Sequence, residues 1–192
     1  MESLGSREGI FQAKMEIAKH IAGDDELTGT LIYASDSEFL TKERTKGNYD
    51  QISVGEKGKD DYIISSVDDF GMDGIKFTLE YAQEVRQISL PLPGRHNAIN
   101  SALAVAVGDL LGVSPEEETD GLAAADLTGN RLKRRENGSI CVIDDTYNAS
   151  PDSMKSALRV LEHSRCDGKK IAILGDMYEL GEDSDRQHFG VG

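Results

Sequence analysis

The sequence predicts an α/β fold in which an antiparallel subsheet precedes a strand–helix–strand unit. Short β-rich runs separated by turn-rich connections fill residues 51–90. Leu92-Pro93-Gly94 stops the last of these runs, and a helix is expected from Asn97. After Gly129, an apolar strand, a capped helix and a second apolar strand follow in order. That order is typical of two parallel strands joined by a right-handed crossover helix.

Each element rests on a local pattern. The expected strands are 28–33, 51–54, 61–67, 75–81, 85–90, 139–143 and 170–174. Residues 114–125 should form a helix that begins with Ser114-Pro115. The helix after the 139–143 strand should begin at Ser150-Pro151-Asp152, with Ser150 as the N-cap and Pro151 in the first turn.

A helix is also expected over residues 7–21, because its apolar side chains recur at helical spacing. Lys14 falls inside that apolar arc. A lysine there must extend its amine to solvent, pair it, or change its chemistry. A neutral amine can add carbon dioxide to form a carbamate, which supplies an oxygen ligand for Mg²⁺.

The charge of the chain is uneven. The net charge is −14, and residues 1–128 carry 24 acidic and only 11 basic side chains. The change in balance suggests a domain boundary near Gly129. An acidic chain argues against general nucleic-acid or membrane-surface binding, and the basic cluster Arg131–Arg135 is too short to change that. A solvated linker is one of the interpretations left open for Lys133–Arg135. No run is long and apolar enough to insert into a membrane, and the two cysteines have no metal spacing, so a reducing cytoplasmic setting is expected.

Acidic residues follow the apolar strands of the second half of the chain. Asp144 and Asp145 close one strand, and Asp176 follows the next. Ligands bind outside the carboxyl ends of parallel strands, so these acids are expected at a ligand edge, where Asp145 can accept ribose hydroxyls. The alternative is that they are solvent-facing loop acids.

The start of the helix near Asn97 is a second candidate site. His96, Asn97 and Asn100 lie in its first turns, where backbone N–H groups and the helix dipole favour an anion or a polar ring. The alternative is that Asn97 caps the helix and His96 is exposed. Asn148 and Ser150 belong to a polar segment that can also be an ordinary turn.

Four sequence words occur in an order that resembles the Mur ligase family. They are PGRHNAIN, GNR, IDDTYNASPDSM and AILGDMYELGE, and the opening LGSREGIFQAKMEIA is similar as well. The resemblance covers nearly the whole chain. It implies part of a central ATPase domain with an antiparallel subsheet over residues 1–127, and the first βαβ unit of a Rossmann-like C-terminal domain over 128–192.

The resemblance also implies a reaction. Family members form an amide bond at the expense of ATP, with Mg²⁺, through an acyl phosphate. The words TYNASPDSM and GDMYELG resemble the branch that joins D-alanyl-D-alanine to a UDP-muramyl tripeptide. The implied roles are nucleotide binding by His96, Asn97, Asn100, Arg131 and Asp145, metal binding by Lys14 as a carbamate, and dipeptide binding by Asn148, Ser150 and Asp176.

The chain departs from the family in three places. It contains no Gly-rich phosphate loop, Ser150 stands where the family has Asn, and the loop Ala34–Ser37 lacks the family's Asn and paired acids. We therefore expect an interior piece of a longer ligase, inactive by itself, with Lys14 unmodified. Two alternatives stay open: a non-catalytic nucleotide-sensing or partner-binding module, and an acid–amine ligase with another acceptor.

Overall fold

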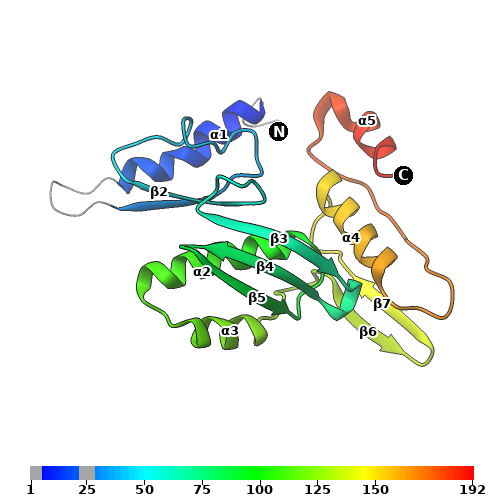
Figure 1. The fold of residues 1–192 in the computed structure, drawn as a ribbon. Helices are drawn as coiled ribbons and strands as arrows, with labels where there is room; N and C mark the ends of the chain where they lie inside the picture. The colour runs from blue at the N-terminus through cyan, green and yellow to red at the C-terminus, as the bar shows by residue number, and fades with distance from the viewer. Residues whose placement is uncertain (1–5, 22–28) are drawn as a thin grey trace. The chain divides into compact units, whose positions relative to one another are not determined.

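The computed structural model describes residues 6–21 and 29–192 (Figure 1). Thr28 of the first expected strand and the first two residues of the LGSREG motif lie outside these ranges. In chain order the elements are α1 (Arg7–Met15), η1 (Glu16–His20), β1 (Thr30–Ala34), β2 (Asp50–Gly55), β3 (Tyr62–Asp69), η2 (Gly71–Asp73), β4 (Ile75–Tyr81), β5 (Glu84–Leu90), α2 (His96–Leu111), α3 (Pro115–Ala123), β6 (Lys133–Asn137), β7 (Ile140–Asp144), α4 (Pro151–His163), η3 (Gly181–Asp183) and α5 (Ser184–Phe189).

The α/β class is confirmed. Strands β1 to β5 form one sheet in that order, and β6 and β7 form a second, two-stranded sheet. The chain divides into two compact units, which share some of these elements. The first is Met1–Ser66, Thr78–Gln87 and Ile99–Glu118, and the second is Val67–Phe77, Ile88–Ala98 and Thr119–Gly192. The helices in the described ranges are all too short or too polar to cross a membrane.

The five-stranded sheet is mixed. A two-residue turn at Ala82 and Gln83, both at positive φ, joins the hydrogen-bonded neighbours β4 and β5. Such a turn reverses the chain, so the expected antiparallel subsheet is present there. For 51–54 the expectation was wrong, because β2 runs parallel to both β1 and β3. The Asp61 carboxylate, and not an antiparallel neighbour, accepts the N–H of Ser53, at 2.8 Å.

The first helix is shorter than expected. It ends at Met15, and residues Glu16–His20 continue as a tighter 3₁₀ turn. Phe11 and Ala18 are buried, but Ile17 on the expected apolar arc is exposed. Lys14 is exposed as well, so its stem does not lie in an apolar interior.

In the second unit, β6 and β7 form the yellow hairpin of Figure 1. The strand expected at 139–143 is confirmed as β7, and it ends at Asp144. Lys133–Arg135 are exposed, but the linker interpretation was wrong, since these residues begin β6 and pair antiparallel with β7. Every residue of β6 is exposed. Its sequence, KRREN, has no apolar residue, so no apolar alternation could predict the strand.

Helix α4 follows the sequence closely. Ser150 is its N-cap and forms a capping box with Ser153, and Pro151 opens the first turn. The prediction of a second strand of the βαβ unit over 170–174 was wrong. The segment is not a β-strand, and Ile173 is 95% exposed. A strand needs a partner for its backbone groups, and within the described ranges no strand pairs with this segment.

Candidate nucleotide-binding site

The turn before α2 holds the first candidate residues in place. Gly94 adopts φ +92°, and a side chain there would bring a Cβ to within 2.7 Å of the His96 ring. Asn97 is only 4% exposed, and its Nδ2 donates a hydrogen bond to the carbonyl oxygen of Pro93 at 2.8 Å. The amide of Asn97 therefore fixes the turn as a donor from the second residue of α2, so the expectation that Asn97 caps the helix was wrong, whereas His96 is exposed as the same alternative expected.

Asp145 lies directly after β7 and binds the chain that leads into the hairpin. Its Oδ1 accepts a hydrogen bond from the backbone N–H of Leu132 at 3.1 Å. Leu132 has φ +48°, a conformation that non-glycine residues rarely adopt. This contact holds the backbone beside Arg131 in an unusual conformation and leaves Oδ2 of Asp145 for other partners.

Arg131 stacks on an aromatic ring that the sequence reasoning did not assign to a site. Its guanidinium carbon lies 4.2 Å from the ring centroid of Tyr147. The backbone N–H of Tyr147 donates to the carbonyl oxygen of Asn130 at 3.2 Å. A tyrosine two residues after the strand-end acids was the available signal. The stacking orients the guanidinium that the family resemblance assigns to the nucleotide.

The two acids at the end of β7 differ in their partners. Asp144 accepts hydrogen bonds from Thr146 Oγ1 at 2.8 Å and Arg135 Nε at 3.2 Å. The Thr146 hydroxyl and the Arg135 guanidinium hold the pKa of Asp144 below its ordinary value. Asp144 is therefore engaged within the hairpin and its turn, and Asp145 is the better ligand candidate.

His96 and Asp145 are brought together electrostatically. Desolvation lowers the pKa of His96 below its ordinary value, and the negative charges of Asp145 and Asp69 oppose part of that shift. The charges of both carboxylates therefore act on the imidazole, which is exposed at the start of α2. An imidazole, when neutral, offers both a donor and an acceptor for a polar ring.

Asn100 lies one turn further along α2, on the same helical face as Asn97. Its side chain is exposed.

The three residues expected to bind the dipeptide have different hydrogen-bond and ion-pair partners. Ser150 Oγ accepts the N–H of Ser153 at 3.3 Å as the α4 cap. Asn148 is exposed, and its Oδ1 accepts the N–H of Ala149. Asp176 is also exposed, with its Oδ1 3.9 Å from Nε2 of His188 on α5.

A resident metal is not supported by the donors present. Across residues 6–21 and 29–192, three or more His, Cys, Asp or Glu side chains never gather in a way that could hold a metal ion. Lys14 is exposed on α1 and has Glu16 and Lys19 near it in sequence. The His, Cys, Asp and Glu side chains in these ranges therefore do not form a complete Mg²⁺ site by themselves.

Comparison with known proteins identifies the family of this chain. A model described as the Mur ligase middle domain matches residues 1–108, and one described as the Mur ligase, glutamate ligase domain matches residues 130–192. The chain belongs to the Mur ligase family. The resemblance predicted from the sequence words is confirmed.

Similar proteins from several bacteria carry the same ligase name. The UDP-N-acetylmuramoyl-tripeptide–D-alanyl-D-alanine ligase of Bacillus subtilis is 36% identical over 95% of this chain and 38% of its own length. The Escherichia coli protein of the same name is 29% identical over 100% of this chain and 42% of its own length. The chain thus spans about two fifths of the relatives it matches.

Solved structures agree. Crystal structure I of MurF from Acinetobacter baumannii matches with a TM-score of 0.85 and 33% identity, over 98% of this chain and 40% of that one. MurF ligase from Thermotoga maritima in complex with ADP matches with a TM-score of 0.80 and 27% identity, over 98% and 42%.

Proposed function

We propose that the protein containing this chain is an ATP-dependent acid–amine ligase that adds D-alanyl-D-alanine to UDP-N-acetylmuramoyl-tripeptide in peptidoglycan precursor synthesis. The observation that carries the proposal is the 36% identity with the Bacillus subtilis ligase over 95% of the chain. The words TYNASPDSM and GDMYELG support the same branch of the family. The protein would act in the cytoplasm, on small-molecule substrates.

The proposed reaction has two steps. The terminal carboxylate of the tripeptide attacks the γ-phosphorus of ATP, which forms an acyl phosphate and releases ADP. The amine of D-alanyl-D-alanine then attacks the acyl carbon through a tetrahedral intermediate, and phosphate leaves. When bound with ATP in the intact protein, Mg²⁺ would supply neutralising charge at the transferring phosphoryl group. Lys14, as a carbamate in the intact protein, would be one of the residues that hold it.

The proposed nucleotide contacts come from two segments. Asp145 would accept the ribose hydroxyls through Oδ2, while its Oδ1 holds Leu132. Arg131, oriented by Tyr147, would lie over the nucleotide. His96, Asn97 and Asn100 would form the adenine side, and the dipeptide would meet Asn148, Ser150 and Asp176. We assign residues 1–127 to the central ATP-binding domain and 128–192 to the C-terminal domain.

The substrate proposal is tested by turnover of the full-length protein. Phosphate release and product mass are measured with ATP, the UDP-muramyl tripeptide and either D-alanyl-D-alanine or single amino acids. Turnover with D-alanyl-D-alanine as the acceptor, and not with single amino acids, supports the proposal. Turnover with a single amino acid and not with the dipeptide would replace it with another acid–amine ligase.

The nucleotide contacts are tested with two neighbouring carboxylates. Asp145→Asn should raise the KM for ATP by about 10-fold to 100-fold, as expected for losing one hydrogen bond to a charged group. Asp144→Asn is the matched control, because Asp144 is engaged by Arg135 and Thr146. An equal rise in both variants would contradict the assignment of Asp145.

A nucleotide-sensing module is the second candidate, favoured by the loop Ala34–Ser37, which lacks the Asn and the paired acids of the family. The 192 residues contain no phosphate loop, so they supply no backbone cradle for the β- and γ-phosphates. Calorimetry of the 192-residue chain with Mg-ATP should show no binding tighter than about 1 mM. Micromolar affinity without turnover would favour the sensing module.

A further inference from the structure

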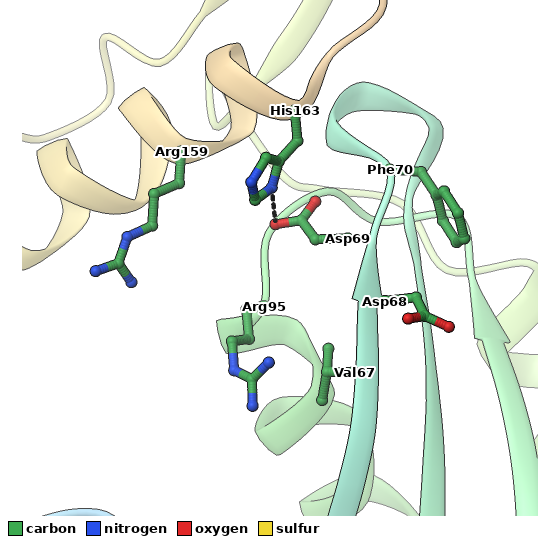
Figure 2. Close-up of a pocket in the computed structure, with 7 residues that line it drawn as sticks. All are labelled: Val67, Asp68, Asp69, Phe70, Arg95, Arg159 and His163. Atoms are coloured by element: carbon green, nitrogen blue, oxygen red, sulfur yellow. Dashed lines mark ion pairs between the residues drawn. The ribbon is translucent and has the colours of Figure 1, made fainter.

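A cleft in the second unit is lined by basic side chains from helix α4 and from the turn before α2. It has a volume of about 710 Å³ and lies between the end of β3, the start of α2 and one face of α4 (Figure 2). Arg95 comes from the turn before α2, and Arg159 and His163 come from α4. Val67 and Phe70 supply apolar parts of the wall. None of the cleft's lining residues belongs to the nucleotide set proposed above.

The acids of this cleft are already engaged or turned away. Asp69 Oδ2 lies 3.2 Å from Nδ1 of His163, and its Oδ1 accepts the N–H of Gly71 at 2.9 Å. Only 13% of the Asp69 side chain is exposed. In Figure 2, Asp68 points to the other side of β3 from Asp69 and the two arginines. The carboxylates therefore do not neutralise the guanidinium of Arg159.

Arg159 is the basic group with capacity to spare. It is exposed on α4, one turn before His163, and it makes no hydrogen bond or ion pair with any residue in the described ranges. Figure 2 shows its guanidinium and that of Arg95 on the same open side of the cleft. A guanidinium offers paired N–H donors that match the oxygens of phosphate or carboxylate.

We propose that the cleft formed by Arg159, Arg95 and His163 binds a small oxyanion that is not part of the nucleotide. The oxyanion would lie between the two guanidinium groups, with the Asp69–His163 pair forming the floor. Phosphate should bind more tightly than a monocarboxylate, because it carries more negative charge and more acceptor oxygens.

Calorimetric titration of the full-length protein with sodium phosphate, at pH 7.5 and constant ionic strength, tests the proposal. We expect saturable binding, weakened about tenfold or more in Arg159→Gln. The matched control is Arg165→Gln, which removes the same charge from a side chain that is 87% exposed and outside the cleft. Sodium acetate, titrated in the same way, should bind more weakly than phosphate.

The outcomes separate this site from the nucleotide site. ADP affinity should be unchanged in Arg159→Gln and reduced in Asp145→Asn. Phosphate affinity should be reduced in Arg159→Gln and unchanged in Asp145→Asn. No saturable phosphate binding, or equal loss in Arg159→Gln and Arg165→Gln, would overturn the proposal. A parallel loss of ADP affinity in Arg159→Gln would also overturn it, because the oxyanion would then belong to the nucleotide. Arg159 is exposed, and unchanged circular dichroism will verify that the variant folds.

Discussion

The strands of the five-stranded sheet and strand β7 of the hairpin both contain apolar runs, but they differ in burial. In the sheet, Phe77, Leu79 and Val54 are completely buried. In the hairpin, Ile140 is 64% exposed, and the apolar segment after α4 leaves Ile173 almost wholly in solvent. The difference teaches that an apolar run becomes a buried strand only where a neighbouring strand pairs with its backbone and another layer covers its side chains.

The largest effect should come from emptying the core of the sheet. Leu79→Ala should lower the free energy of unfolding by about 3 kcal/mol, since it removes buried methyl groups and leaves a cavity. Ile173→Ala, the control in the exposed segment, should change it by less than about 0.5 kcal/mol. Urea unfolding followed by circular dichroism measures both. Equal losses would mean that the two regions are equally packed.

A glycine at the start of β4 sharpens the same comparison. Gly74 has φ +94°, and a Cβ there would lie 2.2 Å from the carbonyl oxygen of Leu90. Gly74→Ala should therefore cost about 2 kcal/mol through backbone strain and displacement of β5. Gly175 has open space around it, so Gly175→Ala is the matched control. The midpoint of thermal unfolding is measured for both variants. A midpoint lowered as much in Gly175→Ala as in Gly74→Ala would contradict the prediction.

Capping of α4 should give a smaller effect. Ser150→Ala removes the oxygen that accepts the N–H of Ser153, at a cost of about 1 kcal/mol. Ser150→Asn should restore most of it, because Asn caps as well as Ser does. Urea midpoints of the three proteins test this order. A loss in Ser150→Asn as large as in Ser150→Ala would show that the cap is not the stabilising contact.

The pH dependence of stability should show the smallest effect. Desolvation lowers the folded pKa of His96, so below about pH 6.5 the unfolded chain binds its proton first. The free energy of unfolding should therefore fall as pH drops from about 7 through the folded pKa, and remain lower beneath it. His96→Gln should flatten that slope. The free energy of unfolding is measured by urea titration at pH values from 8 to 5. An increase in stability as the pH drops, or the same slope in His96→Gln as in the original protein, would refute the prediction.

The sequence predicted the elements whose signals are local. Ser150 and Pro151 marked the start of α4 correctly, because a cap and a first-turn proline act within one helical turn. The strand that ends at Asp144 was found from its apolar run. The strand pairings were less predictable, since the parallel direction of β2 and the absence of pairing for 170–174 depend on distant partners.

The candidate site was also predicted unevenly. His96 and Asp145, far apart in sequence, were expected to act together through the family resemblance alone, and their joint role in nucleotide binding stays a prediction. The position of Tyr147 after the strand-end acids was a signal for an aromatic side chain near the site, but its partner Arg131 could not be predicted, because the contact joins residues 16 positions apart across the hairpin. Charged β6 lacked the apolar alternation by which strands are recognised.

The hairpin has a consequence for amide hydrogen exchange. β7 pairs with β6 on one edge, and across the described residues its other edge has no strand beside it. In an antiparallel pair, alternate N–H groups point toward the partner, and the rest point away. Exchange along Ile140–Asp144 should therefore alternate between slow and fast from one residue to the next, whereas both edges of β4, between β3 and β5, should exchange slowly.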